Sequence, residues 1–292
     1  MAPARAGRKA AVVRAPVTAL AWPARGIAAS LHRRLNRHLH RHLAPIALGL
    51  LVPLGLLVAW AAAAASGWLP EQILPAPRIV AETLVEMVRS GELAQHAGIS
   101  GLRVLAGFSL GAGFGLLLGG AMGLSRRVED AVSPLFTALA QVPTLGWIPL
   151  LMLFLGIGET LKIVVIAKAA LVPVTLNTAA GIRAIPEGYR EVARAYRFTR
   201  VQTLRRLILP ASVPPVFTGI RYGLTKAWTA LVAVELLASA EGLGYLLVWG
   251  RQMFWLDTMI VAMALIGLVG VAMDAVLARI EARLQLWRID AR

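Results

Sequence analysis

The sequence predicts an all-α, polytopic membrane protein with about six transmembrane helices. Of its 292 residues, 58% are apolar and only 15% are charged, whereas about 25% of an average soluble domain is charged. Apolar stretches of about twenty residues recur along the chain, and a soluble core of this size could not hide them. We place the spans at residues 44–65, 102–124, 134–156, 161–180, 212–236 and 257–279.

Several classes of chemical site are excluded by what the sequence lacks. The chain has no cysteine, which excludes disulfides, thiolate metal sites and a cysteine nucleophile. It has no G-x-x-x-x-G-K-[ST] pattern, so it does not bind ATP through a P-loop. Paired carboxylates, His/Glu metal spacing and a nucleophile elbow do not stand out either. We therefore expect no catalytic residue, metal site or cofactor, and any energy must come from a partner.

The N-terminal segment is strongly basic: residues 1–42 carry nine Lys or Arg and no acid. Its first half, rich in Ala, Pro and Arg, is expected to be disordered. In its second half Leu31, Leu35, Leu39 and Leu43 recur every four residues among Arg and His, which predicts an amphipathic helix on the inner leaflet. The alternative is a basic tail that only fixes topology. The following apolar run is longer than a signal-peptide core and long enough to span.

The distribution of charge predicts the orientation of the chain. Most Lys and Arg residues fall in four segments that would lie on one side, namely 1–42, 125–133, 181–211 and 280–292. The segments 66–98 and 237–256, which would lie on the other side, hold only three Lys or Arg and five acids. Because cytoplasmic loops carry the excess of positive charge, both termini are expected in the cytoplasm. The net charge of +15 is then explained without nucleic acid.

Two further patterns concern packing. After Pro75 and Pro77, apolar residues at helical spacing predict a short amphipathic helix on the outer surface that ends at Gly91. In the second span glycine recurs every fourth residue and forms one bare ridge, which indicates close packing against another helix. The glycines are Gly107, Gly111, Gly115, Gly119 and Gly123.

Proline residues interrupt the third and fourth spans at Pro143, Pro149 and Pro173. Broken helices persist in a membrane where protein or a water cavity satisfies the backbone. Gln141, Thr144 and Trp147 flank the first break and either line a gate or occupy a simple packing kink.

Residues 181–211 are too polar to span and are patterned as two short helices. Pro186 and Glu187 suit a first helical turn, and a helix is predicted from about Gly188 to Tyr196. Thr199 and Gln202 have the spacing of a capping box, so a second helix starts near Arg200. Pro210 is expected to end it, and the fifth span begins at Ser212. A rigid basic helix pair of this kind suits the docking of a soluble partner.

This loop resembles the coupling loop of ATP-binding cassette (ABC) importer permeases, whose pattern is Glu-Ala-Ala, three residues, Gly, nine residues, Ile, one residue, Leu-Pro. Glu191, Ala193, Leu209 and Pro210 match it, with Leu207 at the Ile position. Arg197 replaces the glycine, so either the turn is strained or the first helix runs on and bends later. The resemblance assigns coupling to the ATPase to Gly188, Tyr189, Glu191, Ala193, Arg194, Arg197, Leu209 and Pro210.

The resemblance covers about residues 70–290 and is greatest to permeases for aliphatic sulfonates, taurine and nitrate. The matching stretches are LPAPRIVAETLVEMV, GLRVLAGFSLG, QVPTLGWIPLLMLFLGIGE and EGLGYL, with Asp274 and Glu281. It implies a type I ABC importer-like permease fold, with a cytoplasmic tail at 1–43, a transmembrane domain at 44–280 and a C-terminal tail at 281–292. It also implies a second permease copy, two ATPase subunits that bind ATP and Mg, an outer substrate-binding protein, and a location in the bacterial inner membrane.

Ionisable groups at membrane depth mark a pathway or a pair. Lys168 and Lys226 would attract an anionic solute strongly in a cavity of low dielectric. Alternatively, one of them pairs with Glu235 as structural charge. Trp228 is either a pathway wall or a packing anchor, and Asp274, with Arg279, is expected to snorkel to the inner boundary.

These observations predict a non-enzymatic permease subunit of an ATP-driven importer for a small anionic solute, working by alternating access. Gln141, Lys168, Lys226, Trp228 and Glu235 are its candidate pathway residues. The alternative is a secondary transporter driven by an ion gradient, with Lys168, Lys226 and Glu235 as coupling charges. Such transporters usually contain internal repeats, and we find no convincing repeat here.

Overall fold

A computed structural model describes residues 49, 51–67 and 70–284, and all regular structure within these ranges is helical. The chain divides into two units, residues 1–59 and 60–292. The apolar helix Leu51–Ala65 covers the end of the first unit and the start of the second. It forms the later part of the predicted first span. The predicted amphipathic helix at Leu31–Leu43 and the C-terminal residues 285–292 lie outside the described residues.

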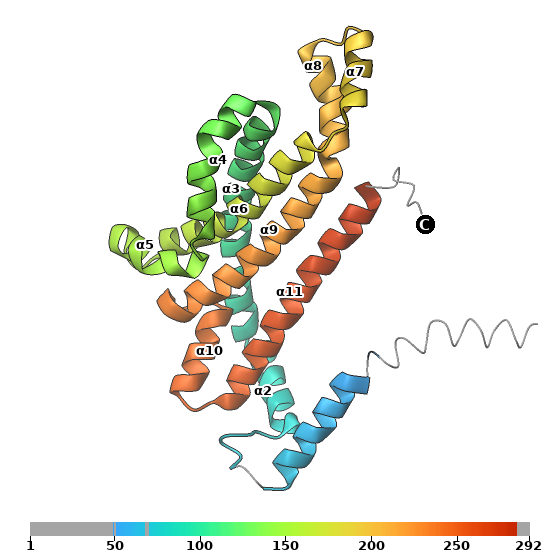
Figure 1. The fold of residues 1–292 in the computed structure, drawn as a ribbon. Helices are drawn as coiled ribbons and strands as arrows, with labels where there is room; N and C mark the ends of the chain where they lie inside the picture. The colour runs from blue at the N-terminus through green and yellow to red at the C-terminus, as the bar shows by residue number, and fades with distance from the viewer. Residues whose placement is uncertain (1–48, 50, 68–69, 285–292) are drawn as a thin grey trace, which may run out of the picture. The chain divides into compact units, whose positions relative to one another are not determined.

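The second unit consists of helices joined by short turns (Figure 1). The four long helices are α3, α6, α9 and α11, and shorter helices connect or flank them. In chain order the elements are α2 Pro77–Arg89, α3 Glu92–Leu124, α4 Arg126–Gln141, the 3-10 turn Thr144–Trp147, α5 Ile148–Leu155, α6 Glu159–Arg183, α7 Glu187–Ala195, α8 Arg200–Thr203, the π turn Leu204–Ile208, α9 Leu209–Ala238, α10 Leu243–Gln252 and α11 Leu256–Leu284.

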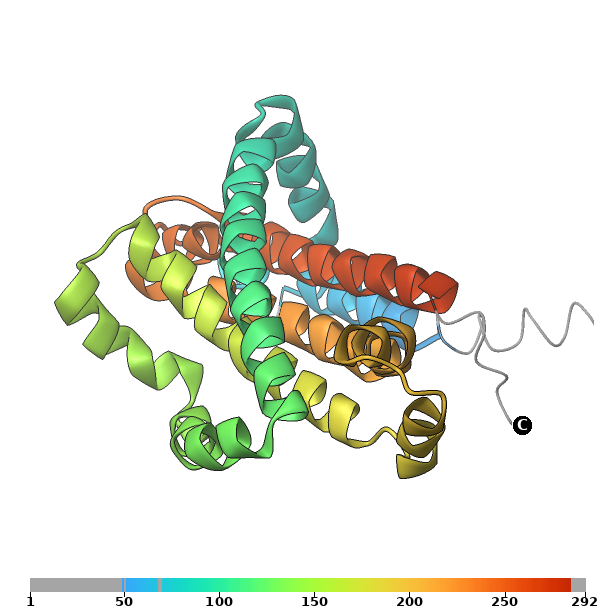
Figure 2. The ribbon, with the colours of Figure 1, turned by 90° about the horizontal axis from the view of Figure 1, so that it is seen from above.

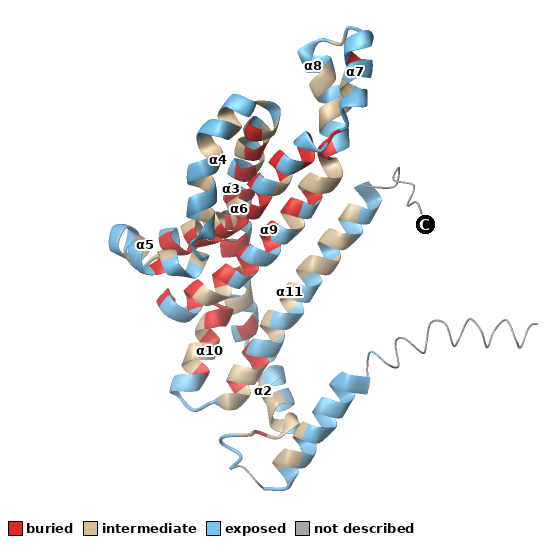
Figure 3. Cartoon of the chain, viewed as in Figure 1, coloured by how far each residue is buried: buried red, intermediate tan, exposed pale blue. Residues whose placement is uncertain are grey.

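Helix α6 lies between α3 and α9 and forms the centre of this unit (Figures 1 and 2). The glycine ridge of α3 faces α6, as the spacing predicts. A methyl group added at Gly119 would lie 2.5 Å from the Thr175 carbonyl oxygen, and one at Gly115 would lie 2.9 Å from Cβ of Val174. Small residues therefore allow the two backbones to approach closely. The buried residues gather on these three helices, whereas α11 is mostly exposed or half-buried (Figure 3).

Three helices, α3, α6 and α11, are long and apolar enough to cross a membrane. Counting each bent helix pair as one span raises the number to five among the described residues. The helix predicted after Pro75 and Pro77 is present as α2, which ends at Arg89, two residues before Gly91 in left-handed conformation. Helix α3 begins ten residues before the predicted span, since a helix can extend beyond its apolar stretch into polar sequence.

The predicted third span, 134–156, is not one straight helix. Helix α4 ends at Gln141, and the chain then turns by 91° into the 3-10 turn and α5. The break lies at Pro143, where one of the breaks is predicted. Pro173, in contrast, lies inside the continuous helix α6, so the expectation of an interruption there is wrong. The Asn177 side chain donates a 2.8 Å hydrogen bond to the Pro173 carbonyl oxygen, in addition to the helical bonds around it.

Candidate functional site

The predicted helix pair forms at one end of the second unit, where α7 and α8 extend beyond the ends of α6 and α9 (Figure 1). The capping box is present as the sequence predicts. The backbone N–H of Gln202 donates to Thr199 Oγ1 at 3.2 Å, and the backbone N–H of Thr199 donates to Gln202 Oε1 at 2.8 Å. These two bonds satisfy donors that a helix start leaves free, and they fix the direction in which α8 begins.

Arg197 adopts the left-handed conformation, with φ at 52°. The Phe198 N–H donates to the Ala193 carbonyl at 2.9 Å, and the Arg197 N–H donates to the Arg194 carbonyl at 2.9 Å. This pair of bonds is the Schellman arrangement that ends a helix. Of the two predicted alternatives the strained turn is therefore the one observed, and α7 does not run on past it.

The surface of the helix pair combines exposed aromatic, aliphatic and charged side chains. Tyr189 and Tyr196 are 60% and 75% exposed, and Val192 is 55% exposed. Ala193 is buried inside the turn. Gly188, Glu191, Arg194, Arg197, Leu209 and Pro210, the other residues assigned to coupling, are exposed. A large exposed apolar patch rimmed by charge is typical of a protein-docking surface.

Pro210 does not end the second helix, contrary to the prediction. The chain passes from α8 through the π turn Leu204–Ile208 directly into α9, with Pro210 near the start of α9. Proline lacks an N–H and its ring clashes with the carbonyl four residues earlier in an α-helix. The wider π turn accommodates that defect, so α9 begins at Leu209 rather than at Ser212.

The two predicted lysines line the same cavity. Its volume is about 410 Å³, and it lies where α6 and α9 meet the break between α4 and α5. Lys168 enters from α6 and Lys226 from α9. The other described residues of the wall are apolar or uncharged, and none is a carboxylate. The lining residues of interest are Val142, Thr144, Asn177, Tyr222 and Thr229.

Three other predicted pathway residues lie elsewhere. Gln141 is the exposed last residue of α4, beside the cavity but not in its wall. Trp228 is 9% exposed, and its Nε1 donates to the Ile266 carbonyl at 3.2 Å, so it packs against α11. Glu235 is 1% exposed. It pairs with Arg103 rather than with Lys168 or Lys226.

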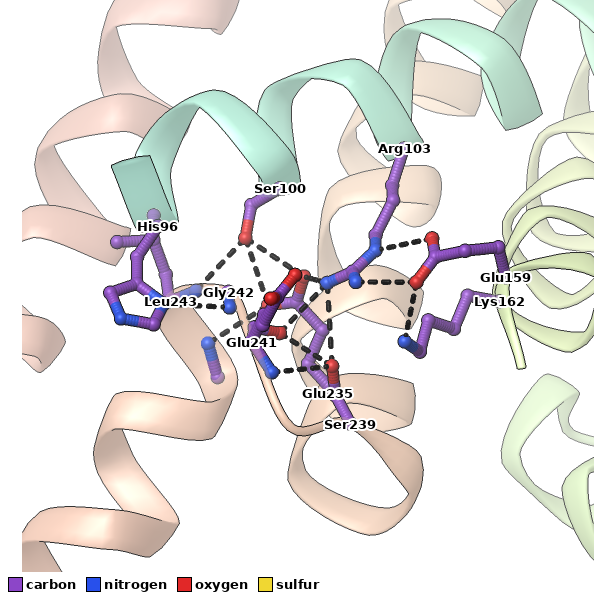
Figure 4. Close-up of polar contacts among 11 residues, drawn as sticks. His96, Ser100, Arg103, Glu159, Lys162, Glu235, Ser239, Glu241, Gly242 and Leu243 are labelled. Carbon is purple, nitrogen blue, oxygen red and sulfur yellow. Dashed lines mark hydrogen bonds and ion pairs between the residues drawn. The ribbon is translucent and has the colours of Figure 1, made fainter. Parts of the chain in front are cut away.

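Arg103 and Glu235 form the centre of a buried polar network (Figure 4). The Arg103 Nη1 donates to Glu235 Oε1 at 2.8 Å, and its Nε and Nη2 donate to the two Glu159 oxygens at 2.7 and 2.6 Å. Lys162 adds a bond to Glu159 at 2.8 Å, and Ser100 donates to Glu235. The bidentate Arg–carboxylate geometry is among the strongest of protein hydrogen bonds. The network ties α3, α6 and α9 together.

The turn after α9 completes the network. Gly244 N–H donates to Glu235 Oε2 at 2.9 Å, and the Glu241 carbonyl accepts from Arg103 at 2.8 Å. A methyl group at Gly242 would collide with the Glu235 carboxylate, and one at Gly244 would lie 2.7 Å from Glu235 Cβ. Glycine is therefore required at Gly242 in this turn and at Gly244 in the first turn of α10 for the Glu235 side chain to fit.

Sequence reasoning missed Arg103, Glu159 and Lys162. A signal was available, because Arg103 lies one helical turn before Gly107 on the face that packs against α6. An arginine on a packing face at membrane depth needs a partner. Three of the stretches that carry the resemblance, GLRVLAGFSLG, QVPTLGWIPLLMLFLGIGE and EGLGYL, meet at this one network.

Asp274 does not snorkel as predicted. Arg221 of α9 binds it with two hydrogen bonds, Nε to Oδ1 at 2.6 Å and Nη2 to Oδ2 at 2.7 Å. Arg221 Nη1 also donates to Glu281 at 3.3 Å. These bonds join α9 to α11, whose last turn lies beyond the predicted domain boundary at residue 280.

Comparisons with known proteins identify a matching family model and similar sequences. A family model described as "Binding-protein-dependent transport system inner membrane component" matches residues 111–286. The chain is 37% identical over 240 residues to the aliphatic sulfonates transport permease protein SsuC of Bacillus subtilis, covering 82% of this chain and 87% of that protein. It is 31% identical over 237 residues to the taurine transport system permease protein TauC of Escherichia coli, covering 80% and 86%.

A solved structure of the MetNI methionine ABC transporter in an inward-facing conformation also matches. The TM-score is 0.51 at 20% identity, with 71% of this chain and 95% of that chain covered. A likeness at this identity concerns the fold alone, and it confirms the predicted permease fold.

Proposed function

Because the chain belongs to the family of binding-protein-dependent transport inner membrane components, we propose that it imports a small anionic solute through a pathway formed with a second copy of itself. The chain is a multi-pass membrane permease, a non-catalytic subunit of an ABC importer. Membership of this family implies an ATPase and a binding protein as partners. It also decides against the alternative of a secondary transporter driven by an ion gradient.

The single observation that supports an anionic solute is the cavity with two lysines. Lys168 and Lys226 reach it from different helices, and no carboxylate in its described wall neutralises them. Lys168 is half-buried and Lys226 is exposed, so an anion here would meet at least one ammonium group that is partly shielded from water, where the attraction is stronger than in bulk water. The relatives named for aliphatic sulfonates and taurine transport solutes that carry a sulfonate group, which supports a sulfonate-like solute here.

The proposed ATPase-docking surface is the exposed face of α7 and α8. It presents Tyr189, Val192 and Tyr196 together with Glu191 and Arg194, a composition suited to a soluble partner with an apolar groove. The helix pair continues through the π turn into α9, which carries Lys226. Movement of the docked ATPase subunits would therefore be transmitted along one continuous helical segment to the cavity.

The proposed orientation places both termini in the cytoplasm. The α3–α4 turn with Arg126 and Arg127, the α7–α8 pair and the C-terminal end of α11 all lie toward the same end of the second unit, whereas α2 and α10 lie toward the other (Figure 1). The end with the arginine-rich segments suits the cytoplasmic side. In the proposed cycle, ATP binding opens the pathway outward and hydrolysis returns it inward, driven by ligands that distinguish the two states.

The test is ATP hydrolysis by the permease assembled in lipid with its own ATPase and binding protein. We expect that binding protein loaded with one solute from a panel of alkanesulfonates, taurine, nitrate and aromatic carboxylates stimulates hydrolysis above the empty protein. The matched control is an ATPase variant unable to hydrolyse ATP, which should show neither hydrolysis nor uptake. Solute uptake by this chain alone, driven by an ion gradient, would refute the proposal.

A further inference from the structure

The two lysines of the cavity differ in what they contact. Lys168 Nζ donates a 2.9 Å hydrogen bond to the Val142 carbonyl and lies 5.1 Å from the centroid of the Trp147 ring. Lys226 Nζ lies 5.2 Å from the Tyr222 ring, one turn earlier on the same helix. No hydrogen bond or ion pair joins Lys226 to any residue that the structure describes. One ammonium is thus engaged by the protein and the other is available.

The contacts of Lys168 fall on the break between α4 and α5. Val142 is the C-cap that follows Gln141, the last residue of α4; its backbone is extended, so its carbonyl lies beyond the helical ladder. Trp147 ends the following 3-10 turn. A charge-assisted hydrogen bond and a cation–π contact from α6 therefore hold both sides of the break. The Trp147 indole Nε1 is buried with no hydrogen-bond partner in the described part of the chain.

The exposure of Ile148, the first residue of α5 after the break, indicates whether the break is held in place. Ile148 is 1% exposed and packs in a cluster with Leu161, Val165 and Ala169 of α6. Val234 of α9 belongs to the same cluster. The cover of Ile148 therefore depends on α5 lying against α6 and α9, and the chain reaches α5 only through the 91° bend. Loosening the bend would uncover Ile148.

We propose that the lysines have separate tasks: Lys226 receives the anionic group of the solute, and Lys168 is a positioning residue that ties the α4–α5 break to α6. This rests on the proposed import of an anion. Lys168 already donates one of its three N–H groups to the Val142 carbonyl, whereas Lys226, which among the described residues contacts only the Tyr222 ring, keeps all three N–H groups for an anion. The first ammonium therefore sets the shape of the cavity wall, and the second sets the preference for negative charge.

The Lys168 half is tested by thiol labelling, which needs no solute and no ATP. The chain contains no cysteine, so Ile148→Cys introduces one thiol per permease chain, and its labelling in the complete permease–ATPase complex in lipid is read on the permease band after gel separation from the ATPase. We expect Lys168→Gln to raise the rate of maleimide labelling about tenfold, because local opening exposes the thiol. Lys168→Arg should restore the slow rate, and Lys226→Gln should leave it unchanged. Val165→Cys, in the same cluster, should label slowly in every background.

Equal labelling of Ile148→Cys with and without Lys168 would overturn the positioning role.

The Lys226 half is tested by equilibrium binding of radiolabelled butanesulfonate to the same complex at low ionic strength. Lys226→Gln should weaken binding about tenfold and Lys168→Gln less than threefold, since only the former removes a charge contact with the anion. No binding by the unmodified complex, or the reverse order of effects, would overturn the role of Lys226. Failure of the proposed function would show separately, as absent stimulation by every loaded binding protein.

Discussion

Arg103 and Glu235 form the most deeply buried ion pair in the part of the chain that the structure describes. Their side chains are 4% and 0% exposed. Arg103 donates to Glu159 of α6, to Glu235 of α9 and to the Glu241 carbonyl in the turn after α9. Glu235 accepts from Ser100 and Arg103 of α3 and from the Gly244 N–H of α10. Removing one partner of a buried ion pair leaves an uncompensated charge, which costs more than the pair itself contributes. The charged partner that explains why Glu235 can be buried is therefore Arg103, which also binds Glu159, and not either lysine of the cavity.

The first prediction concerns this pair. Glu235→Leu should lower the free energy of unfolding by about 1–3 kcal/mol, because Arg103 then loses its buried carboxylate and keeps only Glu159, whose side chain is 58% exposed, as a charged partner. The double variant Arg103→Met with Glu235→Leu should be more stable than Glu235→Leu alone. Thermal unfolding of the purified chain in detergent measures both. Arg78→Ala, which breaks the exposed Arg78–Glu82 pair, is the control and should change stability by less than about 1 kcal/mol. Unchanged stability of Glu235→Leu would contradict the network's structural role.

The second prediction concerns Arg197. A non-glycine residue in left-handed conformation is strained by about 1–2 kcal/mol, so Arg197→Gly should stabilise the α7–α8 turn by about 1 kcal/mol. Hydrogen exchange of the amides in residues 187–203 would measure it as slower local opening. The control is Arg194→Gly, inside α7, which should destabilise the helix by about 1 kcal/mol. Faster exchange in Arg197→Gly would show that the arginine side chain contributes more than its backbone costs.

At the scale of elements, helix α3 depends on its glycine ridge for contact with α6. The third prediction is that Gly111→Ala destabilises the fold by about 1–3 kcal/mol, because the added methyl group meets the Ala167 backbone. The matched control is Gly113→Ala, two residues away on the open face, where nothing lies within 4 Å. Comparison of the two melting temperatures isolates packing from helix propensity. Equal effects would mean that α3 is not held by close approach.

Elements with local signals could be predicted from the sequence. Proline and glycine punctuation located α2, the capping box located the start of α8, and glycine spacing identified the packing face of α3. The 91° turn after α4 and the passage of α9 through Pro210 could not be predicted in the same way. Both depend on distant partners or a wider turn: Ile148 packs against residues of α6, and the π turn removes the conflict that Pro210 would otherwise create.

The residues of the candidate site likewise divide into those that the sequence could identify and those that it could not. The sequence identified Lys168 and Lys226 by their charge at membrane depth, and the structure places both in one cavity. It could not assign the partner of Glu235, since Arg103 is 132 residues away along the chain. A single sequence indicates that a charge at membrane depth needs a partner, but it does not identify the residue that neutralises this charge.

At the scale of the whole molecule, function depends on a partner meeting α7 and α8. The fourth prediction is that Tyr196→Ala, which removes a ring 75% exposed, weakens association with the ATPase by about thirtyfold, as expected for an aromatic anchor in an interface. Binding of the purified ATPase to the permease in nanodiscs measures this. Val88→Ala, on the exposed face of α2, is the control and should not affect binding. Normal association of the Tyr196 variant would place the docking surface elsewhere.

The number of residues in the π turn Leu204–Ile208 sets the direction in which the proposed docking surface on α7 and α8 faces. Each residue added to a helix rotates everything beyond it by about 100°. The turn contains one residue more than an α-helical turn of the same rise, and it stands between α8 and α9. Deleting one residue there would swing the exposed tyrosines around the helix axis while every side chain stayed the same. The segment should therefore tolerate many substitutions and almost no change in length.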